Sequence, residues 1–508
     1  MVQIVSRRRI QRPQFSRNSA YAALGIISTA LSLFVVYRFA AGSIGVGSLG
    51  TWSVSSSMMS LVSVADLGLP LTMVREVARA RALGGGASMG KLIALSALFA
   101  LLATVSLAAC GAYGVRWMVN AYVLQGAHPV SVKFIFICAL VASLTSVSTL
   151  LTGALEGFER YDLKSACLVA SSVLLIWVAH LMLETDGLVG LAWAFLVQSS
   201  SATVFSAIAV CVAVRQERQG TSHEDRDRAT FPGAISQLKQ MIRVGIPLRA
   251  ASLSVFFFEP ATRFFIGMIG GARSIGIYEL ASRLCIQAFT LVTGALQVMV
   301  PRMAALRSEK EDGLDHFLVF ASHLTFVAAL FGFFAIVLSA IPVSFLVLGA
   351  ANTDFIMLVA LLAMGWMLHV LASPAYFANM ADGEVSWNWI SQWLAALVSL
   401  AIGPALGFAF GWRAVVLGPL AGLTGAMLVA IWGRRRRTKR TAFYLPRFSD
   451  VSTILIVGMM LMALQGIGTF LSQRRLHPEI LNSIVLVLYC MIALPHAISV
   501  VRRASHNA

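Results

Sequence analysis

The stretch FFFEPATRFFIG, residues 256–267, places two opposite charges inside a helix-length apolar run. Glu259 and Arg263 are four residues apart, and the surrounding residues 243–267 are mostly apolar. A hydrocarbon core about 30 Å thick needs roughly 20 apolar residues per helical span. The run is therefore long enough to cross a membrane. Its two charges must find partners or reach water, because an isolated charge in a bilayer is costly.

The rest of the chain is also strongly apolar. Of its 508 residues, 58% are hydrophobic and 12% are charged, and the mean hydropathy is +0.81. Soluble proteins average about 25% charged residues. The composition predicts an all-α polytopic membrane protein with about fourteen transmembrane helices. The predicted spans are 18–41, 48–74, 89–113, 132–153, 164–183, 187–213, 243–267, 275–301, 315–341, 354–377, 386–410, 413–432, 450–470 and 480–500.

The formal net charge of +17 is concentrated on one side of these spans. Most Lys and Arg residues lie at the two termini and in alternate loops, so the positive-inside rule places both termini in the cytoplasm. The tract RRRRTKR, residues 434–440, is then most simply a topology anchor, and nucleic-acid binding is disfavoured. The basic N-terminus is followed by no small-residue cleavage site, so the first helix is expected to remain.

Two stretches of the chain repeat each other. They are YRFAAGSIGVGSLGTW, residues 37–52, and TRFFIGMIGGARSIGIY, residues 262–278. Matching pairs are Arg38 with Arg263, Phe39 with Phe264, Gly42 with Gly267 and, after a one-residue insertion, Gly50 with Gly276 and Trp52 with Tyr278. Six predicted helices separate the copies, and an even number preserves direction, so the halves are parallel repeats.

The repeat divides the chain into two parallel six-helix lobes with two further C-terminal helices. The longest polar segment, residues 215–228, lies between the halves, and its Asp-Arg-Asp is more simply a solvated loop than a metal site. The predicted domains are an N-terminal lobe at 1–214, a cytoplasmic linker at 215–242, a C-terminal lobe at 243–433, and a basic loop with the last two helices at 434–508.

Polar residues form stripes on several predicted spans. Arg249, Glu259 and Arg263 fall within an arc of about 80° on one helix. On the next helix Glu279, Arg283, Thr290 and Gln297 fall within about 40°, with Gln287 beside them. The first two helices add Arg38, a serine-rich surface that includes Ser53, and Asp66.

Two interpretations of these charges remain open. In the first, Glu259 with Arg263 and Glu279 with Arg283 are i,i+4 pairs that lock the helices, while Arg38 and Arg263 snorkel to the headgroups. In the second, arginines from several helices converge to hold an anionic group, since guanidinium forks bind phosphate oxygens bidentately. The candidate substrate-binding residues are Arg38, Arg249, Arg263, Arg283, Gln287 and Gln297, with Asp66, Glu259 and Glu279 as charge partners.

Three histidines lie in the ninth and tenth predicted spans. His316 and His323 share a face, and His369 lies near the middle of its helix. An intramembrane histidine is more often a packing hydrogen bonder than a proton relay, and His369 is the candidate for proton coupling. The six cysteines include no C-x-x-C pair, so we predict no metal site, and we predict no cofactor.

Several motifs resemble the polysaccharide flippases of the Wzx type. LGTWSVSSSMMSLVSVADLGLPLTMVREVA, residues 49–78, resembles their second helix. TGALEGFERYDL, residues 152–163, resembles their turn between helices 4 and 5, and residues 241–304 are similar to their seventh and eighth helices. Glu259 departs from the pattern, which has mostly neutral residues before Pro260.

The resemblance implies a member of the multidrug/oligosaccharidyl-lipid/polysaccharide exporter superfamily. Such a protein would move undecaprenyl-diphosphate-linked oligosaccharide from the inner to the outer leaflet of the bacterial inner membrane, for O-antigen, capsule or exopolysaccharide assembly. It would not be an enzyme. Its implied partners are the lipid-linked oligosaccharide, membrane lipids, a polysaccharide polymerase and chain-length proteins.

Other function classes fit these sequence features less well. A multidrug or cation antiporter of the same fold would favour acidic residues alone in its cavity, whereas arginines accompany them here. A membrane glycosyltransferase or polymerase would need charged residues in a sizeable outer loop, and the predicted outer loops are short. A scaffold explains neither the duplication nor the embedded charges.

Overall fold

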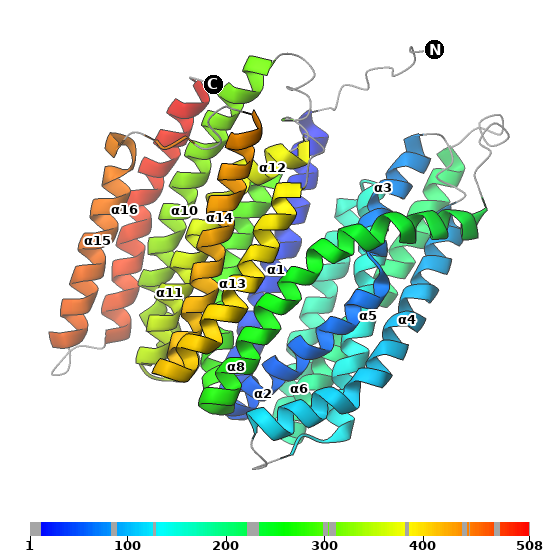
Figure 1. Cartoon of the computed structure of the whole chain (residues 1–508), viewed down its shortest axis with the longest axis horizontal. Helices are drawn as coiled ribbons and strands as arrows, with labels where there is room; N and C mark the ends of the chain where they lie inside the picture. Colours follow the sequence, from blue (N-terminus) through cyan, green and yellow to red (C-terminus); the bar gives the residue numbers. More distant parts are fainter. Residues whose placement is uncertain are drawn as a thin grey trace. The chain divides into compact units, whose positions relative to one another are not determined.

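The computed structural model describes residues 12–82, 89–124, 129–220, 233–297, 303, 311–381, 386–438, 444–446, 448–471 and 478–506. These residues are almost entirely helical and contain no strand (Figure 1). The all-α class is therefore confirmed. The longer helices are α1 (Arg12–Ser43), α2 (Gly45–Met59), α3 (Leu69–Ala82), α4 (Met89–Met118), α5 (Val132–Gly157), α6 (Tyr161–Gly220), α8 (Ala234–Gln297), α10 (Glu311–Leu348), α11 (Thr353–Val370), α12 (Ser373–Ala381), α13 (Ser386–Phe410), α14 (Leu417–Thr438), α15 (Phe448–Leu471) and α16 (Pro478–His506).

Within the described residues, ten helices are long and apolar enough to cross a membrane, and the bent pair of α2 with α3 raises this to eleven. The two longest helices, α6 and α8, each contain a glycine whose backbone leaves the helical region, Gly187 at φ 57° and Gly271 at φ 74°. Positive φ is accessible to glycine without a Cβ clash, so the chain can turn there. Each half of α6 is long enough to span a bilayer. The total of fourteen spans stays a prediction.

Helical segments join into two compact units. Unit 1 comprises residues 1–39, 58–117 and 130–250, and unit 2 comprises 40–57, 118–129 and 251–508. The predicted linker, 215–242, is helical at both ends, since α6 runs to Gly220 and α8 begins at Ala234. Its Asp-Arg-Asp lies outside the described residues. The predicted domain boundaries stay a prediction.

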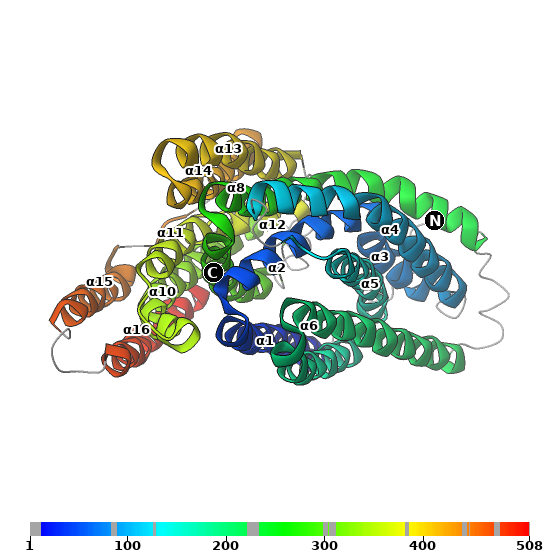
Figure 2. The ribbon, with the colours of Figure 1, turned by 90° about the horizontal axis from the view of Figure 1, so that it is seen from below.

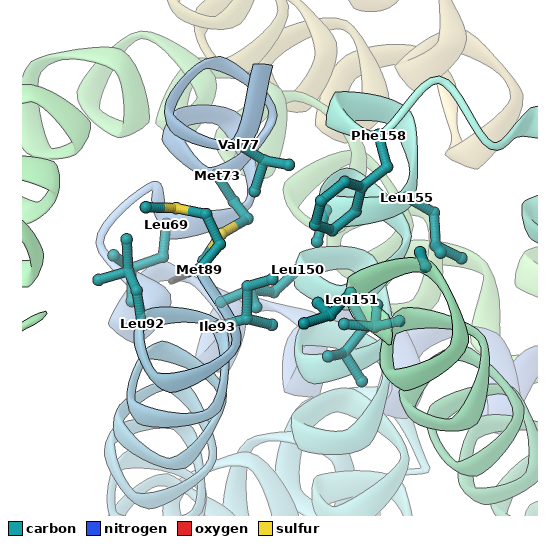
Figure 3. Packing of buried hydrophobic residues seen from close by; sticks show 14 of the residues in the cluster. Leu69, Met73, Val77, Met89, Leu92, Ile93, Leu150, Leu151, Leu155 and Phe158 are labelled. Atoms are coloured by element: carbon teal, nitrogen blue, oxygen red, sulfur yellow. The ribbon is translucent and has the colours of Figure 1, made fainter. Parts of the chain in front are cut away.

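The core of unit 1 is a cluster of buried apolar side chains from α3, α4 and α5, with contributions from α6 and the start of α8 (Figure 3). Leu69, Met73 and Leu150 in this cluster are each 0% exposed. The turn motif between α5 and α6 contributes through Gly157, where an added Cβ would lie 2.7 Å from Val77 Cβ and 2.8 Å from the Val74 carbonyl oxygen. The small residue lets α5 approach α3 closely, as small residues do at helix interfaces in membranes.

We expect Gly157→Leu to destabilise the protein by about 1–3 kcal/mol, because the added side chain would overpack the α3–α5 contact. Gly114→Leu, in α4, is the matched control. An added Cβ there meets nothing within 4 Å. The measurement is the thermal unfolding midpoint in detergent, and equal midpoints for the two variants would contradict this account of α5 packing.

Unit 2 contains two groups of packed helices. The helices α13 and α14 run side by side, and α10 packs against both α15 and α16 (Figures 1 and 2). In the second group the ring of Tyr489 stacks on Phe331 at a centroid distance of 5.4 Å, and its hydroxyl donates a hydrogen bond to the Phe331 carbonyl at 3.3 Å. The last two helices are therefore attached to unit 2 through their own apolar core.

The helix α2 meets the second half of α8 within unit 2 through two glycines of the sequence repeat. An added Cβ at Gly50 would lie 1.8 Å from the Ala272 carbonyl oxygen, and one at Gly276 would lie 2.0 Å from the Val46 carbonyl oxygen. Both positions therefore require glycine, because the two helix backbones touch. Two residues matched by sequence thus lie on facing sides of one contact, which fixes the helices around the charged residues beside it.

Candidate functional site

Four charged side chains of α8 form a continuous chain of ion pairs, hereafter the charge ladder. It consists of Glu259, Arg263, Glu279 and Arg283, and α8 turns back at Gly271 between its two halves. Arg263 Nη1 lies 3.0 Å from Glu259 Oε2, and Arg263 Nε lies 2.9 Å from Glu279 Oε2. Arg283 Nε lies 2.6 Å from Glu279 Oε1. The two predicted i,i+4 pairs therefore form, and a third ion pair joins them across the turn.

The ladder is buried in its middle and more exposed at its ends. The side chains of Arg263 and Glu279 are 2% and 1% exposed, whereas those of Glu259 and Arg283 are 27% and 36% exposed. Two acids and two bases alternate, so the formal charge of the ladder is zero. The prediction that Arg263 snorkels is wrong, because its guanidinium is drawn inward by two carboxylates.

One group from α2 and one from α8 itself line the middle of the ladder. Ser53 of α2 donates a hydrogen bond to Glu279 Oε2 at 2.7 Å, across a sequence separation of 226 residues. The ring of Tyr278 lies with its centroid 6.0 Å from the Arg263 guanidinium, at the limit for a cation–π interaction. Among the described residues, Arg263 Nη2 is buried and has no hydrogen-bond partner. The sequence placed Ser53 on a polar surface but did not predict this contact.

A second charged group lies in unit 1, where the span of α2 and α3 is broken. Asp66 is buried, accepts hydrogen bonds from the Gly68 backbone N–H at 2.8 Å and the Ser146 hydroxyl at 2.9 Å, and lies 3.6 Å from Arg249. Arg249 also donates to the Ser63 hydroxyl at 2.6 Å. The carboxylate therefore holds the break in position. Asp66 and Arg249 were predicted as a charge partner and a binding residue, and they pair with each other.

The segments that carry these two charged groups also match a protein family. A family model described as polysaccharide biosynthesis protein matches residues 15–307, which include the charge ladder and the Asp66 group. The chain belongs to this family. A comparison with curated proteins finds no significant match.

Solved structures similar to this chain include two membrane transporters and a flippase. The lipid II flippase MurJ, in an inward closed conformation, is 11% identical and has a TM-score of 0.66. Its alignment covers 94% of this chain and 97% of the MurJ chain. An inward-facing multidrug resistance MATE family transporter of the MOP superfamily is 17% identical and has a TM-score of 0.65. Its alignment covers 82% of this chain and 98% of the transporter chain. A MOP superfamily transporter from Pyrococcus furiosus is 16% identical and has a TM-score of 0.59. Its alignment covers 84% of this chain and 95% of the transporter chain. At these identities the likeness shows the fold alone.

Three other predicted site residues are Arg38, Gln287 and Gln297. Arg38 is exposed and belongs to unit 1. Gln287, one turn beyond Arg283, is half-buried. Gln297 is the last residue of α8, and its side chain lies outside the described residues, as does the side chain of His316.

The candidate histidine for proton coupling lies in the last turn of α11. The ring of His369 packs edge-on against Trp366, with ring centroids 5.8 Å apart. Among the described residues its Nδ1 is buried without a hydrogen-bond partner. The structure therefore places no described acid or base against that nitrogen, and the role of His369 stays a prediction.

We expect Arg263→Ala to destabilise the protein more than the double change Glu259→Ala, Arg263→Ala. The single change leaves Glu259 without its partner, while Glu279 keeps Arg283 and Ser53. Because Glu259 is partly exposed, the double change should recover about 1–2 kcal/mol rather than the full 3–5 kcal/mol of a buried pair. The measurement is the unfolding midpoint in detergent. A double variant less stable than Arg263→Ala would refute the pairing account.

Proposed function

We propose that this protein flips undecaprenyl-diphosphate-linked oligosaccharide from the inner to the outer leaflet of the bacterial inner membrane. The product would be used for O-antigen, capsule or exopolysaccharide assembly, and the protein would act as a transporter rather than an enzyme. Membership of a polysaccharide biosynthesis family and a fold shared with a lipid II flippase support the proposal. Alternating access between two lobes would carry the headgroup across.

The observation that carries the proposal is the position of Arg283 at the exposed end of a buried ladder. Arginine holds phosphate oxygens through a planar fork, which suits a diphosphate. When Arg283 turns toward a phosphate, Glu279 still accepts hydrogen bonds from Arg263 at 2.9 Å and Ser53 at 2.7 Å. The ladder can therefore release Arg283 without leaving a bare buried carboxylate, which would be costly.

The remaining predicted residues extend this proposal. Arg38, Arg249, Arg263, Gln287 and Gln297 would contact the diphosphate or the sugars, and His369 would couple proton movement to transport. Asp66, Glu259 and Glu279 would hold the arginines in the empty state. A polysaccharide polymerase and chain-length proteins would act on the flipped product.

The second candidate function is a multidrug or cation antiporter of the same fold. It is favoured by the similarity to MATE transporters and by the 27% exposed side chain of Glu259 at the acidic end of the ladder. However, the flippase structure has counterparts for 94% of this chain and the MATE structure for 82%. The greater coverage supports the flippase.

The deciding experiment depletes the protein in its own host and measures lipid-linked oligosaccharide. A flippase should leave this intermediate accumulated and confined to the cytoplasmic face, where it is protected from an externally added glycosidase. Dye efflux measured in the same cells tests the antiporter. If depletion abolished dye efflux and left the amount of lipid-linked oligosaccharide unchanged, the proposal would be overturned.

We expect reporter fusions after Arg228 and after Arg440 to report cytoplasm, and fusions near Gly270 and Arg475 to report periplasm. The basic excess in the first group of loops is the physical reason. The measurement is the activity ratio of paired alkaline phosphatase and green fluorescent protein fusions. A periplasmic signal at Arg440 would contradict the topology with both termini in the cytoplasm.

A further inference from the structure

A pair of tryptophans joins the end of α14 to the start of α13. The rings of Trp387 and Trp432 meet edge to face, with centroids 5.4 Å apart. Gly433 allows this arrangement, because an added Cβ there would lie 2.3 Å from the Trp387 ring. Trp432 remains 50% exposed. The pair lies where the apolar spans of α13 and α14 end, which is the level at which tryptophans meet lipid headgroups.

The first arginine of the RRRRTKR tract is buried rather than solvated. Arg434 is 3% exposed and donates a hydrogen bond to Asn379 Oδ1 at 3.1 Å. Asn379 donates to Asn388 Oδ1 at 3.0 Å, and Asn388 donates to the Tyr376 carbonyl at 3.0 Å. This network joins α14 to α12 and α13. It fixes the rotation of the end of α14, and the role of the tract as a topology anchor stays a prediction.

With the helix end fixed, the next two arginines of the tract are exposed. Arg436 lies over the Trp432 ring at 5.1 Å from its centroid, and Arg435 is exposed beside it. In the part of the chain that the structure describes, no carboxylate lies within ion-pair distance of either guanidinium. A stacked arginine is oriented but not neutralised. The patch Trp387, Trp432, Arg435 and Arg436, hereafter the basic-aromatic patch, therefore presents at least two positive charges.

The opposite end of the same span provides a contrast. Arg413 also lies over a tryptophan, Trp412, at 5.8 Å from its centroid. There, however, Arg413 Nε lies 2.7 Å from Asp354 Oδ1. The outer arginine is thus neutralised by the protein itself. The basic-aromatic patch has no such acid among the described residues, so its guanidinium groups can pair with an external anion.

From this geometry we infer that the basic-aromatic patch binds the headgroup of an anionic phospholipid of the cytoplasmic leaflet. The phosphate would receive the guanidinium forks of Arg435 and Arg436. Basic clusters directly cytoplasmic of a transmembrane helix attract anionic lipids. Leu428, one turn before Trp432, is 58% exposed and offers apolar surface for an acyl chain. A lipid is favoured over a free anion because the patch combines charge with exposed aromatic and aliphatic surface.

The test titrates phosphatidylglycerol or phosphatidylethanolamine into the full-length protein in detergent, with bound lipid counted by native mass spectrometry. Phosphatidylglycerol should bind more tightly than phosphatidylethanolamine. The double change Arg435→Gln, Arg436→Gln should weaken phosphatidylglycerol binding by about 25-fold, at about fivefold for each arginine. Phosphatidylethanolamine binding should not change. Arg413→Gln, the matched control at the other end, should leave both affinities unchanged.

Two further measurements are needed. One distinguishes loss of charge from misfolding, and the other distinguishes lipid binding from the binding of a free anion. Arg435→Lys, Arg436→Lys keeps the charge without the forks and should retain most of the phosphatidylglycerol binding, which excludes a folding defect as the cause of the glutamine result. Inorganic pyrophosphate should not displace the lipid at equal concentration. Unchanged phosphatidylglycerol affinity in the glutamine variant would overturn the inference. Displacement by pyrophosphate, or tighter binding of a polyprenyl diphosphate that the glutamine variant abolishes, would assign the patch to the substrate instead.

Discussion

The Glu279→Ala variant is expected to accumulate in the membrane at only a small fraction of the normal amount. The carboxylate of Glu279 links Arg263, Arg283 and the Ser53 hydroxyl, and its side chain is 1% exposed. Without it, the buried Arg263 retains only Glu259, and the ladder carries a net positive charge in a low-dielectric site. Removing one partner of a buried ion pair costs roughly 3–5 kcal/mol. That is a large part of the stability of an ordinary domain.

The measurement is the amount of protein in isolated membranes, together with the unfolding midpoint of any protein that can be purified. Glu184→Ala is the matched control, because Glu184 is an exposed acid within α6, and it should change stability by less than about 0.5 kcal/mol. Glu279→Gln should be intermediate, since the amide keeps the shape and loses the charge. A Glu279→Ala protein present and stable at the normal level would show that the ladder contributes little to folding.

Arg283→Ala is expected to leave the protein at its normal level and to abolish polysaccharide export. Its side chain is 36% exposed, and Glu279 keeps two other partners when it is removed. The structural cost should therefore be small. A lost charged hydrogen bond to phosphate costs about 1.5–3 kcal/mol, so export should fall on the order of tenfold to a hundredfold. Arg283→Lys should restore it in part, because an ammonium lacks the bidentate fork.

Export is measured as surface polysaccharide in a deletion strain that carries each variant, with membrane protein quantified in the same samples. Arg273→Ala tests whether any arginine of α8 has this effect, since Arg273 is exposed on the same helix. It should export normally. Full export by Arg283→Ala would refute the role of Arg283 in binding the diphosphate, whatever the stability results show.

The sequence predicted those parts of the site that depend on helix periodicity. The pairs Glu259 with Arg263 and Glu279 with Arg283 are four residues apart, and a helix brings such residues together without help from tertiary structure. The ion pair between Arg263 and Glu279 depends on the turn at Gly271, which brings the two halves of α8 against each other. Hydropathy predicted a turn between the spans 243–267 and 275–301, but periodicity does not say which faces of the two halves meet. The snorkelling interpretation of Arg263 failed for that reason.

The same limit applies to the fold. Composition predicted an all-α membrane protein, and α13 begins and ends where its span was predicted. Composition did not predict that Arg434 is buried, because a run of four arginines looks uniform along the chain. Its burial depends on Asn379 and Asn388, two amides on other helices that accept and relay its hydrogen bond.

The contact between Ser53 and Glu279 has a consequence for how such a protein can be assembled from two copies. The repeat matches Gly50 with Gly276, and on the same register Ser53 corresponds to Glu279, its hydrogen-bond partner at 2.7 Å. In a symmetric dimer of identical half-length chains, this position would face itself. Two glutamates would repel each other there, and two serines would leave the arginines without a carboxylate. A single chain with both halves covalently joined can hold a donor in one copy and an acceptor in the other, which no pair of identical subunits can do.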